Sequence, residues 1–310
     1  MSTPLIIGTR ASELALRQTE QVERSLSGHH SGLPIVRKLI RTAGDRCANL
    51  PLAEIPKAAG VGRGVFSAAI QQALLAGEID CAVHSLKDLP GETDPRLDIA
   101  ATLPRADIHD VLVLKQGANP ENLTIGTGSV RRRVLARAYW GAGVLIKEMR
   151  GNVPTRLRKL AADAGLSGIL LSRAGLTRLG YTEPALTIDG IRLICIDLPR
   201  DSFTPAAGQG TIAVQIRRND TRTREIVSCL DDPITHICSR TERAFLCRLQ
   251  ADCSTPVGAY ARVINGSITF RVLHCGPDGI LRRVVARGPA ESPEDVASLA
   301  VGLLQEYQRD

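Results

Sequence analysis

The stretch PLIIGTRAS (residues 4–12) decides the fold class, because a short apolar strand runs directly into a helix start. Ser12 is placed to cap a helix that continues to about Ser27. The stretch LTIGTGSVRR (residues 123–132) repeats the same order of strand, turn and helix. This alternation predicts an α/β chain with mainly parallel sheets that helices cover.

The same reading extends through most of the chain. Residues 65–74 place apolar side chains on one helical face, and further helices fit residues 129–139 and 154–164. One more predicted strand, 211–217, could return to the first sheet. The other predicted strands cover residues 35–42, 79–84, 111–114, 123–125, 144–149 and 168–171.

The pattern changes after about Asp220, where a helix over residues 234–250 leads into three strands. Asn265-Gly266 and Pro277-Asp278-Gly279 are turn sequences of the kind that joins antiparallel strands. A capped amphipathic helix begins at Ser292-Pro293. We therefore expect a small C-terminal α+β domain with a three-stranded antiparallel sheet.

Positive charge gathers in one region. The 310 residues contain 33 Arg and only 6 Lys, and residues 123–178 alone carry nine Arg and two Lys against Glu148 and Asp163. A guanidinium binds carboxylates and phosphates through two parallel hydrogen bonds, which indicates an anionic partner. A coding bias towards Arg is the alternative that composition leaves open. Only nine residues are aromatic, so nucleic-acid binding is less well supported than a small carboxylate or phosphate ligand.

Eight cysteines without a CxxC pair are weak evidence for a structural zinc site, and we expect no metal. The N-terminal residues lack the basic segment and the long apolar run of a secretion signal. No stretch is apolar for long enough to span a membrane. We expect a cytoplasmic chain with reduced thiols and no membrane partner.

Three turns combine a strand end, a guanidinium and a helix start, which is an arrangement that binds anions. They are GTRAS (8–12), GTGSVRR (126–132) and RGNVPTR (150–156), and two of them facing each other across two lobes would enclose acids. A fourth segment, AVHSLKDLP (82–90), places Lys87 and Asp88 just after a buried strand. An acid there can donate and accept protons, although a surface ion pair explains the same residues. Glycines 60–64 indicate a mobile loop or one of close approach rather than a dinucleotide site.

These motifs, in this order, resemble those of the porphobilinogen deaminases, also called hydroxymethylbilane synthases. The resemblance covers nearly the whole chain, and further matches are AGLTRLG (174–180), PAAGQG (205–210), ERAFLCRL (242–249) and CSTPVGAY (253–260). It implies two lobes like those of periplasmic binding proteins around a cleft, plus a third domain. The implied domains are 1–102 with 201–219, 103–200, and 220–310.

The resemblance also implies the reaction. Four porphobilinogen molecules condense with loss of ammonia onto a dipyrromethane cofactor joined through sulfur to Cys253, and a linear hydroxymethylbilane is released. Asp88 and Lys87 are the implied catalytic residues. Cys253, Ser129, Arg131, Arg132, Lys87 and Asp88 are the implied cofactor-binding residues. Arg10, Ser12, Arg63, Arg150, Arg156 and Arg178 are the implied substrate-binding residues. We expect a monomer that acts on this small molecule and binds no nucleic acid.

Several positions depart from the family pattern. Ala251-Asp252 stand where two glycines usually precede the cysteine, Arg63 replaces a lysine, and Gly128 replaces a hydroxyl residue. We expect these changes to affect cofactor loading and turnover more than the identity of the reaction. A non-catalytic anion-binding relative with the same two lobes is the rival reading, and RNA binding through residues 123–178 is a weaker one.

Overall fold

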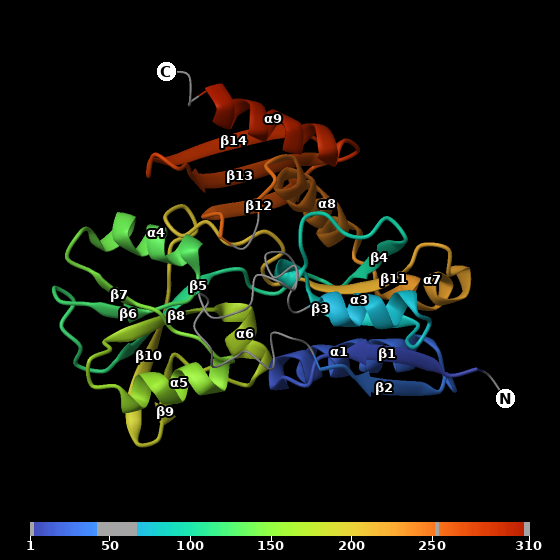
Figure 1. Cartoon of the computed structure of the whole chain (residues 1–310), viewed down its shortest axis with the longest axis horizontal. Helices are drawn as coiled ribbons and strands as arrows, with labels where there is room; N and C mark the ends of the chain where they lie inside the picture. The colour runs from blue at the N-terminus through green and yellow to red at the C-terminus, as the bar shows by residue number, and fades with distance from the viewer. Residues whose placement is uncertain (1–2, 42–66, 252–253, 307–310) are drawn as a thin grey trace.

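The computed structural model describes residues 3–41, 67–251 and 254–306, which form three sheets with helices packed against them. Figure 1 shows the first sheet on the right, the second on the left and the third at the top. The predicted fold class is confirmed: the chain is α/β, with two lobes and a small C-terminal unit built on a three-stranded antiparallel sheet. Among the described residues, no helix combines the length and the hydropathy that a bilayer crossing requires.

The first sheet has five strands, and four of them run parallel. The exception is β11, which lies antiparallel between β3 and β4, so the prediction that this segment returns to the first sheet is confirmed. Helix α1 packs on one face through Val22 and Leu26, and α3 packs on the other face through Ile70 and Leu74. The elements are β1 (Leu5–Thr9), α1 (Glu13–His29), β2 (Ile35–Leu39), α3 (Ala68–Leu75), β3 (Cys81–Ser85), β4 (Leu97–Thr102) and β11 (Ile212–Arg217).

The second sheet has six strands in the order β7-β6-β8-β5-β10-β9. Alternate residues of β5 enter different cores, because Val111 and Val113 pack with α5 and α6 whereas Leu112 packs with α4. Its strands are β5 (Asp110–Lys115), β6 (Thr124–Gly126), β7 (Leu145–Lys147), β8 (Gly168–Ser172), β9 (Ala185–Ile188) and β10 (Ile191–Asp197). Its helices are α4 (Val130–Trp140), α5 (Val153–Ala162) and α6 (Arg173–Arg178). The sequence patterns did not predict β4, β9, β10 or α6.

Two crossover segments, 103–109 and 198–211, join the two lobes and hydrogen-bond to each other. The amide of Ala106 donates to the carbonyl of Gly210 at 3.2 Å. Gly210 has a φ of +87°, and a Cβ there would meet the Ala106 oxygen at 2.5 Å. Gly208 has a φ of +71°, and a Cβ there would meet the Leu86 side chain at 2.8 Å. The glycines of PAAGQG therefore allow the two crossovers to touch each other and the turn after β3.

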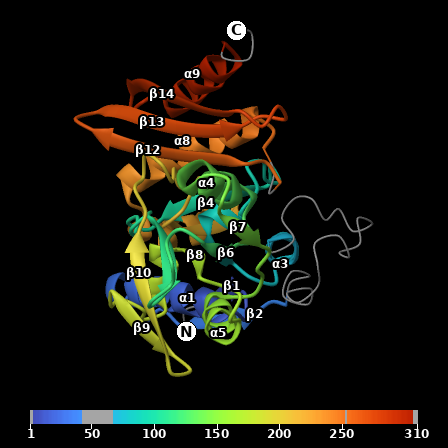
Figure 2. The same ribbon diagram turned by 90° about the vertical axis from the view of Figure 1, so that its left-hand side faces the viewer.

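The third sheet orders its strands β12-β13-β14, all antiparallel. Phe245 of α8 and Ala297 of α9 pack with Phe270 of β13 in its core. Leu273 of β13 packs in the core beside α4, and Figure 2 shows this sheet above that helix. The elements are α8 (Pro233–Arg248), β12 (Val257–Ile264), β13 (Ser267–Cys275), β14 (Leu281–Pro289) and α9 (Pro293–Glu306).

One short segment bears on the domain boundaries, which stay a prediction. Helix α7 (Thr221–Val227) and the 3-10 turn η4 (Ser228–Leu230) place Val227 and Leu230 in the core of the first sheet. The predicted third domain begins at residue 220. From this packing we propose that it begins after Leu230 instead.

Candidate active site

The first part of the site lies where β1 and β3 end side by side in the first lobe. Ser12 caps α1, as predicted, because its Oγ accepts from the amide of Ala15 at 3.4 Å. Arg10 and Ser12 line a small cavity of about 40 Å³ together with Ser85 and Asp88. The structure thus brings the GTRAS turn and the SLKD segment into one site, although 75 or so residues separate them in the sequence.

Lys87 and Asp88 lie on a 3-10 turn, η3 (Leu86–Asp88), directly after β3. The buried Leu86 anchors this turn, since its amide donates to the carbonyl of Thr211 at 3.0 Å. The side chains of Lys87 and Asp88 are exposed. Lys87 Nζ donates to Ser172 Oγ of the second lobe at 3.4 Å, so this turn contacts both lobes.

Burial and the charges of both lobes set the pKa of Lys87. Lys87 reaches solvent, but many protein atoms surround its amine. This desolvation lowers the pKa of Lys87 to about 8, and the positive charge of Arg132 adds to the effect. Asp88 and Asp110 act in the opposite direction on the pKa. Lys87 therefore loses its charge closer to neutral pH than an ordinary lysine.

The second part of the site begins at Ser129, which caps α4 by accepting from the amide of Arg132 at 3.4 Å. Arg131 and Arg132 in the first turn of this helix are buried, and both pair with Asp110. Arg131 Nη1 lies 2.7 Å from Asp110 Oδ2, and Arg132 Nη2 donates to Asp110 Oδ1 at 2.8 Å. Two cations thus share one carboxylate, which leaves this buried group with a formal charge of +1.

The electrostatics of Asp110 follow from that arrangement. Burial alone would raise its pKa, but Arg131 and Arg132 outweigh burial and hold the pKa of Asp110 well below its usual range. The carboxamide of Gln209 also donates to Asp110 Oδ1 at 2.9 Å. Asp110 therefore stays charged and holds both guanidinium groups in place.

Arg150 and Arg156 lie on the next turn of the second lobe. Arg150 Nε donates to Glu148 Oε1 at 2.9 Å, and Arg156 Nε donates to the carbonyl of Gly151 at 2.8 Å. Burial, followed by the charges of Arg132 and Arg150, lowers the pKa of Arg156 to about 10, whereas Asp88 opposes this shift. Arg156 is thus within electrostatic range of predicted site residues from both lobes.

Arg178 lies apart from that group. At the end of α6 it donates from Nη2 to the carbonyl of Gly210 at 2.6 Å, which places it against a crossover segment. Burial lowers the pKa of Arg178 to about 10, and no charged side chain of the described residues contributes to this shift. Two further predicted site residues, Arg63 and Cys253, lie outside the described residues, as do glycines 60–64 of the predicted loop.

The structure explains why glycine stands at position 128, where the family usually has a hydroxyl residue. A Cβ at this position would meet the carbonyl oxygen of Met149 at 2.7 Å, so a serine or threonine would displace the neighbouring turn. Sequence reasoning also missed Asp110 and Glu242. Glu242 is fully buried and accepts from Arg105 Nη1 at 2.6 Å and from the amide of Gly208 at 2.6 Å. A single acid beside an apolar run gives no signal that distinguishes it from a surface residue.

Comparisons with known proteins agree with the motifs. Residues 5–225 match the family model "Porphobilinogen deaminase, dipyromethane cofactor binding domain", and residues 236–305 match "Porphobilinogen deaminase, C-terminal domain". Among solved structures, the methionine-binding protein MetQ matches with a TM-score of 0.41 and 10% identity over 72% of this chain and 88% of that chain.

Curated relatives with the name porphobilinogen deaminase cover most of the sequence. The one from Chlorobium chlorochromatii is 36% identical over 99% of this chain and 95% of its own length. Those from Roseiflexus sp. and Nitrobacter winogradskyi are each 39% identical, over 94% and 88% of this chain and 93% and 83% of their own lengths. The chain therefore belongs to the porphobilinogen deaminase family.

Proposed function

We propose that this chain is a hydroxymethylbilane synthase, a transferase that condenses four porphobilinogen molecules onto a covalent dipyrromethane primer with loss of ammonia. The observation that carries the proposal is the meeting of the two lobes in a chain of this family. Lys87 and Asp88 of the first lobe lie within electrostatic range of Arg132 and Arg156 of the second. An acid opposite desolvated cations suits a reaction that handles a positively charged ring with carboxylate arms.

The residues fit a polycarboxylate cofactor. Each pyrrole ring carries two carboxylates, so its binding requires several fixed cations. Arg131, Arg132 and Asp110 together leave one positive charge, and Arg156 keeps its charge although burial disfavours it. Lys87 and Ser129 add donors beside them. When bound, the dipyrromethane supplies the carbon nucleophile for the first condensation.

Asp88 is the residue we assign to the proton transfers and to the charge that develops on the substrate ring. Its carboxylate accepts a hydrogen bond from a pyrrole N–H, and this interaction strengthens as ammonia leaves and the ring becomes positive. Lys87 and Arg156 hold substrate carboxylates in place beside it. Arg10 and Ser12 line the cavity that Asp88 shares, so they are placed to bind the carboxylates of an incoming ring.

The cellular compartment and the oligomeric state are also part of the proposal. We propose a monomer that works in the cytoplasm on this small substrate and binds no nucleic acid. Free thiols support a reducing compartment: the described cysteines are Cys81, Cys195, Cys229, Cys238, Cys247 and Cys275, and all of them are unpaired.

Intact mass spectrometry of the purified chain tests the proposal most directly. The expected mass exceeds that of the bare polypeptide by two pyrrole units, and Ehrlich's reagent gives a colour. Cys253→Ala is expected to remove both signals and the activity, whereas Cys247→Ala keeps them. Brisk consumption of porphobilinogen by a chain of bare mass would overturn the proposal.

Asp88→Asn tests the assignment of the acid. We expect the variant to keep the cofactor mass but to lose turnover by about 10²–10⁴-fold, the usual contribution of a general acid or base. Single-turnover measurements with porphobilinogen provide the rate. A normal rate would leave the family assignment intact and show that the proton transfers belong to another residue.

A further inference from the structure

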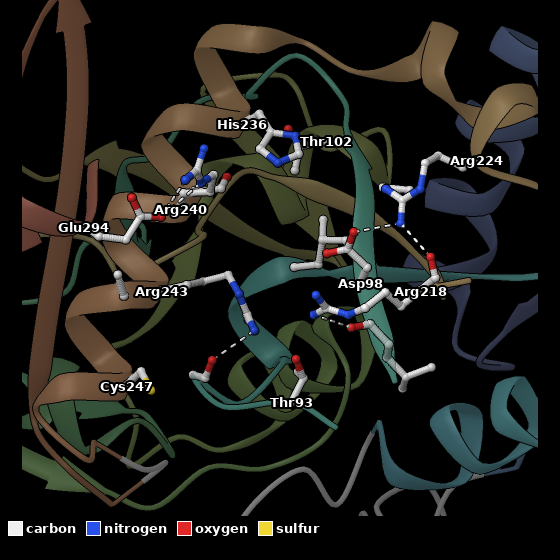
Figure 3. Close-up of a pocket in the computed structure, with 16 residues that line it drawn as sticks. Thr93, Asp98, Thr102, Arg218, Arg224, His236, Arg240, Arg243, Cys247 and Glu294 are labelled. Atoms are coloured by element: carbon white, nitrogen blue, oxygen red, sulfur yellow. Dashed lines mark hydrogen bonds and ion pairs between the residues drawn. The ribbon is translucent and has the colours of Figure 1, made fainter. Parts of the chain in front are cut away.

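A second cavity, of about 460 Å³, lies outside the cleft. It is enclosed by β4 at the edge of the first sheet, by α8 and by the segment that follows the SLKD turn (Figure 3). None of its lining residues lines the smaller cavity beside Arg10 and Asp88. It is therefore a separate site, to which the reaction proposed above assigns no part.

The wall of this cavity is rich in guanidinium groups. Four arginines and two carboxylates line it, which gives a formal charge of +2. Figure 3 shows Arg240 with Glu294 on one side and Arg224 with Asp98 on the other. Arg240 Nη2 donates to Glu294 Oε1 at 2.8 Å, and Arg224 Nη2 donates to Asp98 Oδ2 at 2.9 Å. Each of these guanidinium groups retains further N–H donors, because five are available to each.

Arg243 of α8 also lines the cavity and has no carboxylate partner among the described residues. Its Nη1 and Nη2 donate to the carbonyls of Pro90 and Gly91, both at 3.0 Å. Desolvation lowers the pKa of Arg243 to about 10, so its charge is incompletely compensated. Arg218, the fourth arginine, reaches the cavity from the opposite wall and donates to the carbonyl of Pro95.

A buried hydroxyl gives an independent indication of a ligand. Ser239 of α8 lines the cavity and is only 3% exposed. Its Oγ has no hydrogen-bond partner among the described residues. Because buried polar groups are nearly always hydrogen-bonded, this orphaned hydroxyl on the wall of a basic cavity is available to a ligand oxygen.

We propose that this cavity binds a small oxyanion with two negative charges, which Arg224, Arg240 and Arg243 neutralise and the Ser239 hydroxyl orients. The ligand class follows from the formal charge of +2 and from the guanidinium donors, which suit carboxylate and phosphate oxygens. The volume of about 460 Å³ admits ligands of this size and larger ones, so the charge and not the volume sets the ligand class. A dicarboxylate and a phosphate share this chemistry, and the test separates them.

Cys247 offers a local measure of binding, since it is exposed and lines the cavity. Trypsin releases it in the peptide Ala244–Arg248, which contains no other cysteine. The rate of its alkylation by iodoacetamide is measured on the full chain with increasing inorganic phosphate or succinate, against chloride of equal ionic strength. We expect one of the two anions to slow the alkylation at least threefold and chloride to leave it unchanged, and isothermal calorimetry then gives the affinity.

Variants decide whether the cavity causes the protection. The double variant Arg224→Gln/Arg240→Gln and the single variant Ser239→Ala are expected to weaken binding about tenfold or more. Arg222→Gln is the matched control, because Arg222 lies on α7 like Arg224 but does not line the cavity. Arg10→Gln, in the cleft, should keep the protection of Cys247. The proposal is overturned if neither anion slows alkylation, or if the Arg224, Arg240 and Ser239 variants retain full affinity.

Discussion

The cleft and the second cavity both pair arginine with aspartate, but the two pairings differ in burial. Arg131 and Arg132 contact Asp110 at 2.7 and 2.8 Å with side chains no more than 8% exposed. Arg224 contacts Asp98 at 2.9 Å with both side chains more than a third exposed. The contact distances are nearly equal, so distance does not indicate what each pair contributes. Burial does, because only a desolvated charge is costly to leave alone.

Removal of one carboxylate from each site tests this comparison with the largest expected effect. Asp110→Asn strands two buried guanidinium groups and should lower the free energy of unfolding by about 3–5 kcal/mol. Asp98→Asn, the matched control, should change it by less than about 1 kcal/mol. Urea denaturation at neutral pH measures both. Equal losses in the two variants would contradict the role we give to burial.

The buried Asp110 carboxylate also makes the free energy of unfolding depend on pH in the acid range. The pKa of Asp110 is depressed in the folded chain, so the unfolded chain takes up this proton first, at about pH 3.9. The contribution of Asp110 is therefore complete above that pH and declines as the pH falls further, by about 1.4 kcal/mol per pH unit at most. Denaturation between pH 3 and 7 should show the wild type and Asp110→Asn converging at the acid end. Parallel curves across that range would be inconsistent with the depressed pKa.

Lys87 tests the effect of burial on substrate binding, where the other variants test its effect on stability. Its pKa of about 8 means that the ammonium is present below that pH and is lost above it. KM for porphobilinogen should therefore rise about tenfold between pH 7 and 9, as one charge-assisted contact disappears. Lys87→Arg keeps the charge and should give a flat KM over this range. If the variant shows the same rise as the wild type, the titrating group lies elsewhere.

The smallest effect is expected at the exposed side of the second cavity. Arg240→Gln breaks the pair with Glu294, whose side chains are half exposed, and should change the free energy of unfolding by less than about 1 kcal/mol. That small difference should shrink further in 1 M salt, because the Debye length falls to about 3 Å. Thermal denaturation with and without salt provides the comparison. A salt-independent loss of several kcal/mol would mean that Arg240 is a packing residue.

Local signals in the sequence predicted much of the fold. Apolar runs gave the buried strands, Ser12 and Ser129 gave the helix starts, and turn sequences gave the three-stranded sheet. The strand β9 was missed because it is only four residues long and Thr187 interrupts its apolar residues. The strand β10 contains the apolar run 193–196, so the sequence held a signal for it that was overlooked.

The candidate site was predictable only in part. The GTRAS turn and the SLKD segment were each predicted to follow a strand, but their meeting in one cavity was not predicted. Asp110 and Gln209 were not expected, since their importance comes from contacts between residues distant in the sequence. Asp110 at the start of β5 pairs with Arg131 and Arg132, and Gln209 of a crossover segment donates to Asp110. The position of Arg178, apart from Arg132 and Arg156, also comes from a contact with a distant residue, because Arg178 donates to Gly210 of a crossover segment.

The paired crossovers have a mechanical consequence. Two lobes joined by a single linker can rotate widely relative to each other. Here the amide of Ala106 in one crossover donates to Gly210 of the other, and the amide of Leu103 donates to Ile212 at the start of β11. Any large rotation of one lobe relative to the other would have to break these hydrogen bonds and also the one from the Gly208 amide to Glu242. We therefore expect the two lobes to rotate only slightly relative to each other. The extra room for a lengthening product then comes from rearranged side chains.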